Sequence, residues 1–82
     1  MKVVLYTRPG CHLCEDALVV LRRVQGQIPF ELDTVNIADD RALEALYRLH
    51  IPVVTVDGRE AFRHRADEAA LRASLQAAEV TA

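Results

Sequence analysis

Two cysteines, Cys11 and Cys14, lie where the pattern of apolar residues changes from that of a strand to that of a helix. Residues 3–6 form a short run rich in β-branched side chains, and a Pro-Gly pair soon follows it, so this run predicts a buried strand. From Cys11 onward apolar residues recur at helical spacing, and Gly26 is placed to end the helix. A C-x-x-C pair between a strand and the first turn of a helix constrains the fold more than any other feature of the chain.

The remainder of the chain predicts three further strands and two further helices. Pro52 forbids a continuing helix, and Asp57-Gly58 is a strong hairpin signal because glycine accepts a positive φ. The expected strands cover 3–6, 30–37, 53–56 and 59–62. The expected helices cover 11–25, a segment capped by Asp39 or Asp40 that carries Leu43, Leu46, Tyr47 and Leu49, and 66–79.

This βαβαββα order predicts an α/β fold. The first two strands should run parallel through a crossover helix, and the hairpin should complete a four-stranded mixed sheet flanked by helices. With 82 residues, the chain predicts one domain spanning 1–82, and we expect a monomer.

Charge and composition exclude several classes of partner. The formal net charge is −2, and the aromatic residues are two Tyr and two Phe, so we expect no nucleic-acid partner. No apolar run is long enough for a signal-peptide core or a membrane span, so we expect a cytoplasmic protein without a membrane partner. In a reducing cytosol a pair of cysteines favours catalysis or metal binding over a structural disulfide.

The spacing of the two cysteines predicts thiol–disulfide chemistry. It places both sulfur atoms on one side of the first helical turn, close enough to form a disulfide. The helix dipole and the free N–H groups of that turn should lower the pKa of Cys11, and Arg8 and His12 add positive charge nearby. Cys14 falls on the apolar stripe of the helix and should be more buried. We therefore expect Cys11 to be the attacking nucleophile and Cys14 the resolving thiol.

The expected activity is that of a thiol–disulfide oxidoreductase acting on disulfides in proteins or small molecules. No cofactor is built in, so electrons must come from glutathione, as a candidate co-substrate, or from a reductase. Arg8 and Arg65 would make the rim of the site attractive to an anionic thiol. One alternative is a zinc- or copper-binding module, with Cys11 and Cys14 as ligands; His12 with His50 or His64 would complete a zinc set. The other is an adaptor whose thiols are redox-inactive.

The segment 6–15, which reads Tyr-Thr-Arg-Pro-Gly-Cys-His-Leu-Cys-Glu, resembles the glutaredoxin branch of the thioredoxin-like fold. It is most similar to small glutaredoxin-like proteins that carry an R-P-G-C-H-L-C sequence. The resemblance extends over essentially the whole chain, since Ile51-Pro52-Val53 and Asp57-Gly58 fall where that family has its proline loop and its β-hairpin.

The resemblance implies roles for several residues. Cys11 and Cys14 match the nucleophile and the resolving cysteine, and Pro52 matches a proline that follows a cis peptide bond. The backbone of Ile51 would pair with an incoming substrate as a short strand. Typical glutaredoxins hold glutathione with a Gly-Gly segment followed by acidic residues. Here residues 63–68 contain no glycine, so the close backbone approach should be absent, while Asp67 would meet a glutathione amino group or cap the last helix.

Overall fold

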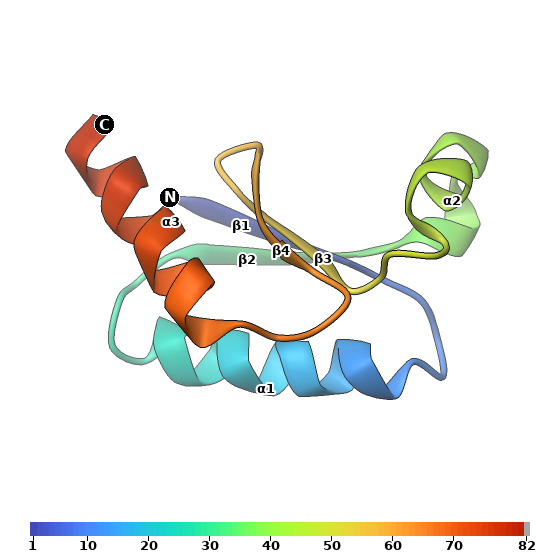
Figure 1. The fold of residues 1–82 in the computed structure, drawn as a ribbon, viewed down its shortest axis with the longest axis horizontal. Helices are drawn as coiled ribbons and strands as arrows, with labels where there is room; N and C mark the ends of the chain where they lie inside the picture. Colours follow the sequence, from blue (N-terminus) through green and yellow to red (C-terminus); the bar gives the residue numbers. More distant parts are fainter. Residues whose placement is uncertain (82) are drawn as a thin grey trace.

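The computed structural model describes residues 1–81 and shows a four-stranded mixed sheet in the order β2-β1-β3-β4 (Figure 1). β1 and β2 are parallel, whereas β3 pairs antiparallel with both β1 and β4. The predicted fold class is confirmed. The elements are β1 (Lys2–Thr7), α1 (His12–Gln25), β2 (Glu31–Asn36), the 3₁₀ turn η1 (Ile37–Asp39), α2 (Arg41–Tyr47), β3 (Val53–Val56), β4 (Arg59–Arg63) and α3 (Glu68–Thr81).

The core lies on one side of the sheet, between the strands and the two long helices. Alternate residues of a strand point to the same face, so Val3 and Leu5 of β1 meet Leu21 of α1 and Leu71 of α3 there. All four side chains are essentially inaccessible to solvent. Figure 1 shows α1 and α3 together on this side of the sheet. The packing fixes α1, and with it the cysteine pair, against β1.

The β3–β4 hairpin forms at the predicted position. Asp57 and Gly58 both have positive φ, 48° and 85°, which is the pair of conformations that a two-residue type I′ turn requires. The Asp57 carboxylate also accepts a hydrogen bond from the backbone N–H of Lys2 at 2.8 Å. The turn is thereby tied to the start of β1, the central strand that leads to the cysteines.

Helix α2 differs from the sequence prediction. It ends at Tyr47, so Leu49 lies beyond it in a turn, and none of its residues is fully buried. Leu46 and Leu49 are 60% and 75% exposed. The helix is attached through the ring of Tyr47, whose centroid lies 4.8 Å from that of Tyr6 on β1. Figure 1 shows α2 at one end of the sheet, away from α1 and α3.

Two other boundaries also differ from the prediction. The strand expected over 30–37 stops at Asn36, whose side chain accepts a hydrogen bond from the N–H of Ala38 and starts the η1 turn. The last helix begins at Glu68 rather than at residue 66. The Asp67 carboxylate accepts a hydrogen bond from the N–H of Ala70 at 2.9 Å, and this capping contact sets the start of the helix.

An ionic cluster joins α1 to α3 at the surface. Arg23 of α1 donates to the Glu68 carboxylate at 2.6 Å, and Arg72 of α3 donates to the same carboxylate at 3.0 Å. The hydrogen bond from Arg23, followed by that from Arg72, lowers the pKa of Glu68 below its ordinary value. Within residues 1–81, none of the helices has both the length and the apolar character needed to cross a membrane.

Candidate active site

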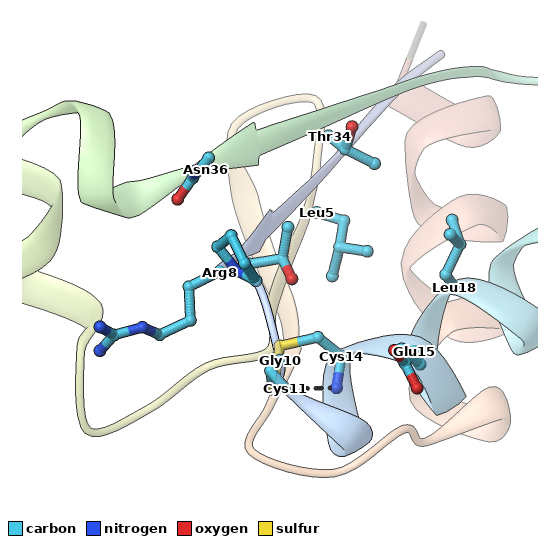
Figure 2. Close-up of a pocket in the computed structure, with 11 residues that line it drawn as sticks. Leu5, Arg8, Gly10, Cys11, Cys14, Glu15, Leu18, Thr34 and Asn36 are labelled. Carbon is cyan, nitrogen blue, oxygen red and sulfur yellow. Dashed lines mark hydrogen bonds between the residues drawn. A yellow bond between two sulfur atoms is a disulfide. The ribbon is translucent and has the colours of Figure 1, made fainter.

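The loop between β1 and α1 places Cys11 at the first turn of the helix. Gly10 has a φ of +79°, a conformation that glycine adopts without the steric cost that a Cβ brings, and the turn it forms directs the chain into α1 (Figure 2). Cys11 itself is the N-cap residue of that helix, in an extended conformation. Its Sγ accepts a hydrogen bond from the backbone N–H of Cys14 at 3.1 Å. The sulfur therefore takes the place that a serine or aspartate oxygen commonly fills at a helix start.

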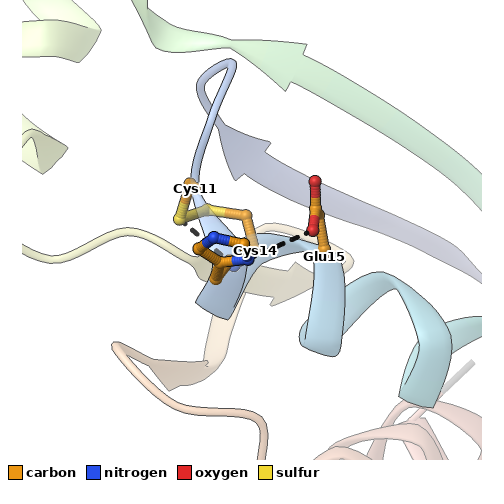
Figure 3. Close-up of a disulfide and its surroundings, with 4 residues drawn as sticks. Cys11, Cys14 and Glu15 are labelled. Carbon is orange, nitrogen blue, oxygen red and sulfur yellow. Dashed lines mark hydrogen bonds and ion pairs between the residues drawn. A yellow bond between two sulfur atoms is a disulfide. The ribbon is translucent and has the colours of Figure 1, made fainter.

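Cys11 and Cys14 form a disulfide across this first turn (Figure 3). Their Cα atoms are 5.2 Å apart, well within the ordinary range for a disulfide. Cys14 is only 3% exposed, whereas Cys11 is partly accessible. The predicted difference in burial is confirmed, and Cys11 is the more accessible of the two residues. The positive end of the α1 dipole and the Cys14 N–H both face the Cys11 sulfur, an arrangement that would favour a thiolate in the reduced protein.

His12 points toward an acidic neighbour. Its Nδ1 lies 3.6 Å from a carboxylate oxygen of Glu15, and its side chain is 96% exposed. A solvated histidine next to a carboxylate exerts only a weak field on other groups. The role of His12 in tuning the pKa of Cys11 therefore stays a prediction, as does that of Arg8.

The Ile51–Pro52 loop carries the cis peptide bond that the resemblance implies. Pro52 is buried and Ile51 is partly buried. The backbone N–H of Ile51 already donates to the Tyr47 carbonyl at 3.1 Å, while its own carbonyl has no hydrogen-bond partner among the described residues. A peptide docking on this loop as a strand would thus find the Ile51 carbonyl free, but not the N–H.

The segment after β4 approaches this loop through its backbone. The N–H of His64 donates to two carbonyl oxygens of the loop, that of His50 at 2.9 Å and that of Pro52 at 2.8 Å. His64 adopts a φ of +72°, in the left-handed region that normally favours glycine. His64 thus takes a left-handed conformation without being a glycine, and the absence of a glycine-dependent close approach to glutathione stays a prediction. Arg65, the next residue in this segment, is exposed to solvent, and Asp67 caps α3.

Replacing His64 with glycine is expected to stabilise the protein. A left-handed conformation costs a residue with a Cβ about 1–2 kcal/mol, which exceeds the roughly 0.5–1 kcal/mol of extra chain entropy that glycine loses on folding. The exposed imidazole gives up no packing. His64→Gly should therefore raise the free energy of unfolding in urea by about 0.5–1 kcal/mol. The control is His50→Gly at a neighbouring exposed position without a positive φ, which should lower that free energy by a similar amount. Equal losses in the two variants would contradict the argument.

A pocket of about 310 Å³ opens beside the disulfide, on the side of the edge strand β2 (Figure 2). It brings together Cys11, Cys14 and Arg8 from the predicted site, but neither Ile51 and Pro52 nor Arg65 and Asp67 line it. Sequence reasoning missed the contribution of β2. The available signal was Thr34, a polar residue that breaks the apolar alternation of its strand. The polar residues that β1 and β2 add to the lining are Thr7, Thr34 and Asn36.

A family model matches this chain, and so do relatives of similar length. Residues 2–76 match the family described as Glutaredoxin-like domain (DUF836). The solved structure of target protein XcR50 from X. campestris is 39% identical, with a TM-score of 0.73, and the match covers 92% of this chain and 96% of that one. An uncharacterized protein of Mycobacterium tuberculosis is 30% identical over 79 residues, covering 90% of this chain and 81% of the relative.

The fold itself is shared more widely. Thioredoxin 1 from Thermosipho africanus is only 12% identical, yet it superimposes with a TM-score of 0.63 over 96% of this chain and 99% of its own. At that identity the likeness establishes the thioredoxin-like fold alone. Within residues 1–81, no three His, Cys, Asp or Glu side chains are grouped so that they could hold a metal ion.

Proposed function

The chain belongs to the Glutaredoxin-like domain (DUF836) family, and from that premise we propose that it is a thiol–disulfide oxidoreductase working through Cys11 and Cys14. One observation carries the proposal: a disulfide at the start of α1 with one accessible and one buried sulfur. The accessible sulfur also accepts a backbone hydrogen bond at 3.1 Å. Such an arrangement gives the two cysteines different chemical roles, which a structural disulfide does not need.

In the proposed reaction the reduced protein transfers two electrons to a disulfide. The Cys11 thiolate attacks one sulfur of the substrate R–S–S–R′, which forms a Cys11–S–S–R mixed disulfide and releases R′S⁻. The Cys14 thiol then loses its proton to solvent and attacks the Cys11 sulfur. This second exchange closes the Cys11–Cys14 bond and releases RS⁻. Each step breaks one S–S bond and forms another, so sulfur atoms and electrons balance.

Two features of the predicted substrate site support the proposal. The free carbonyl of Ile51 can accept a hydrogen bond from an extended peptide substrate. Arg65 lies in the segment that is hydrogen-bonded to the same loop and adds positive charge for an anionic partner. Regeneration of the dithiol needs an external donor, glutathione or a reductase. We propose that the protein works as a monomer in the cytoplasm, without a resident cofactor.

The experiment that tests this proposal is capture of the mixed disulfide. Cys14→Ser removes the resolving sulfur but keeps the accessible one, so the reaction should stop after its first step. The reduced variant is incubated with disulfide-bonded insulin or bis(2-hydroxyethyl) disulfide. A covalent adduct should form on Cys11, which mass spectrometry detects and dithiothreitol removes. Wild-type protein should show the intramolecular disulfide instead.

The matched control is the double variant in which Cys11 and Cys14 are both serine, which should form no adduct. If the Cys14→Ser variant instead forms no adduct within the time in which the wild-type protein reduces the same substrate, Cys11 is accessible but unreactive. That result would contradict the proposed roles. If a Cys11→Ser variant formed an adduct through Cys14 as fast as Cys14→Ser forms one through Cys11, the two cysteines would have the opposite roles.

A further inference from the structure

The end of α2 carries two exposed leucines with an arginine between them. Leu46 lies in the last turn of the helix and Leu49 in the turn after it, and both side chains are mostly exposed. The other large apolar side chains that the structure describes as exposed, Val19 and Val80, stand alone on α1 and α3. A single exposed apolar residue is ordinary, but two in neighbouring turns need a reason. We call Leu46, Arg48 and Leu49 the α2 patch.

Unpaired basic side chains border the two leucines. Arg48 and Arg65 are exposed, and neither forms an ion pair in the described part of the chain. Glu44, one helical turn before Arg48, forms no ion pair with it. The carboxylate of Glu60 is occupied by Arg63, which donates to it through Nε at 2.9 Å. Positive charge is therefore left over for a partner that brings carboxylates.

The α2 patch adjoins the loop where a substrate is expected to dock. Figure 1 shows α2 and the loop from β1 into α1 at the same end of the sheet. Leu49 precedes Ile51 by two residues, so the two positions are at most about 7 Å apart along the chain. The Ile51 carbonyl has no hydrogen-bond partner among the described residues. A substrate strand bonded to that carbonyl reaches the α2 patch within a few of its own residues.

Three kinds of occupant suit an apolar surface with positive charge: a protein segment, an anionic membrane and a second copy of this chain. The free Ile51 carbonyl calls for an N–H donor, which an extended peptide supplies and a lipid acyl chain lacks. A second copy related by a two-fold axis would bring its own Arg48 against this one, and like charges repel. The observations favour a segment of another protein.

We propose that the α2 patch docks a segment of a protein substrate that carries apolar and acidic side chains close to its reacting disulfide. The inference rests on the proposed function and adds to it the chemical class of the substrate. Leu46 and Leu49 cover the apolar side chains of that segment, and Arg48 faces a carboxylate. The adjacent Ile51 carbonyl holds the backbone of the segment, and the substrate sulfur meets Cys11.

The probes are four synthetic peptides, each with one cysteine joined to 5-thio-2-nitrobenzoate in a mixed disulfide. The flanks on both sides of the cysteine read Leu-Glu-Leu, Ser-Glu-Ser, Leu-Lys-Leu or Ser-Lys-Ser. The Cys11 thiolate attacks the peptide sulfur, which forms Cys11–S–S–peptide and releases coloured thionitrobenzoate. The Cys14 thiol then loses its proton to solvent and attacks the Cys11 sulfur, which closes the intramolecular disulfide and releases the peptide thiolate. Colour release therefore measures the first exchange.

The wild-type protein should distinguish these peptides by both kinds of flank. Each kcat/KM is divided by the rate constant of dithiothreitol with the same peptide, which removes differences in the reactivity of the disulfide itself. Leucine flanks should be preferred over serine flanks about tenfold, because the patch buries them. Glutamate flanks should be preferred over lysine flanks about fivefold, the size expected for one exposed charge pair.

Two variants test the α2 patch itself. Leu49→Ser changes a turn residue outside the helix and should reduce the preference for leucine flanks about fivefold, while glutamate flanks stay preferred over lysine flanks. Arg48→Glu should turn the preference for glutamate flanks into one for lysine flanks. Damage to the fold would slow all four peptides together and would not reverse their order.

Matched controls come from exposed residues elsewhere. Val19→Ser truncates an apolar side chain on α1 that is as exposed as Leu46, and Arg59→Glu reverses an unpaired charge on the β3–β4 hairpin. That hairpin is tied to the start of β1, whereas the cysteine loop follows the end of β1. Both controls should keep the wild-type preferences, and circular dichroism checks the fold of every variant.

Several results would overturn the inference. Equal corrected rates for the four peptides would do so, as would preferences that neither Leu49→Ser nor Arg48→Glu changes. Vesicles of phosphatidylglycerol and analytical ultracentrifugation test the other occupants. Vesicle binding or self-association that Leu49→Ser abolishes, with peptide preferences unaltered, would assign the patch to a membrane or to a second copy. Adduct capture by Cys14→Ser with bis(2-hydroxyethyl) disulfide involves no flanks, so its failure would overturn the proposed function instead.

Discussion

Cys11→Ser should reduce the disulfide-reductase activity to the rate of the buffer alone. A serine hydroxyl is not ionised at neutral pH and forms no disulfide with the substrate, so the first step of the reaction has no nucleophile. Serine is also a good N-cap residue, and its oxygen can accept the Cys14 N–H bond that the sulfur now accepts. The variant should therefore lose its chemistry while helix α1 keeps its start. The measurement is dithiothreitol-driven insulin reduction, followed by turbidity.

The comparison with Cys11→Ala separates chemistry from structure. Alanine removes the capping acceptor as well, so this variant should lose about 1 kcal/mol of stability, which the serine variant keeps. Both should be inactive. A Cys11→Ser protein with a wild-type unfolding curve and full reductase activity would show that the disulfide at α1 is not the reacting group.

Leu21→Ala is expected to have the largest effect on stability. Leu21 lies on α1 and is completely buried against β1 and α3. Truncation removes the apolar burial of the side chain and leaves a cavity, which together cost about 2–5 kcal/mol. Small domains have a total stability of about 5–15 kcal/mol, so a large part of it should be lost. Urea unfolding followed by circular dichroism should show a lower midpoint with little change in slope.

Val19→Ala on the same helix is the matched control. Val19 is 62% exposed, so its truncation removes little burial, and alanine has the higher helix propensity. The free energy of unfolding should stay within about 0.5 kcal/mol of the wild-type value. If the two variants lost similar amounts, the assignment of Leu21 to the core and Val19 to the surface would be wrong.

The features that local chemistry determines could be predicted from the sequence. The Asp57-Gly58 turn, the strand 53–56 and the apolar stripe of α1 each follow from residue types at fixed spacing. The difference in burial between Cys11 and Cys14 follows as well, because Cys14 falls on that stripe. These elements contain the core and the cysteine pair, and for that reason the fold class follows from the sequence.

The features that depend on contacts distant in sequence could not be predicted in the same way. Leu46 and Leu49 have the spacing of a buried helix face, but both side chains are exposed, and α2 reaches β1 through the ring of Tyr47. The conformation of His64 follows from two carbonyl oxygens on another loop, and no pattern in residues 63–68 indicates them. The β2 wall of the pocket exists because a helix from elsewhere in the chain leaves the strand edge uncovered.

The hydrogen bond from the Cys14 N–H to the Cys11 sulfur links folding to redox state. The folded and unfolded, oxidised and reduced forms make a closed thermodynamic cycle, so the two unfolding free energies and the two reduction potentials are not independent quantities. An interaction that is stronger in the reduced folded form than in the oxidised folded form shifts the reduction potential of the native protein upward relative to that of its unfolded chain. For a two-electron couple, about 30 mV of that difference corresponds to about 1.4 kcal/mol. A substitution at the start of α1 that stabilises one redox form of the folded protein more than the other therefore also changes the reduction potential of the Cys11–Cys14 pair.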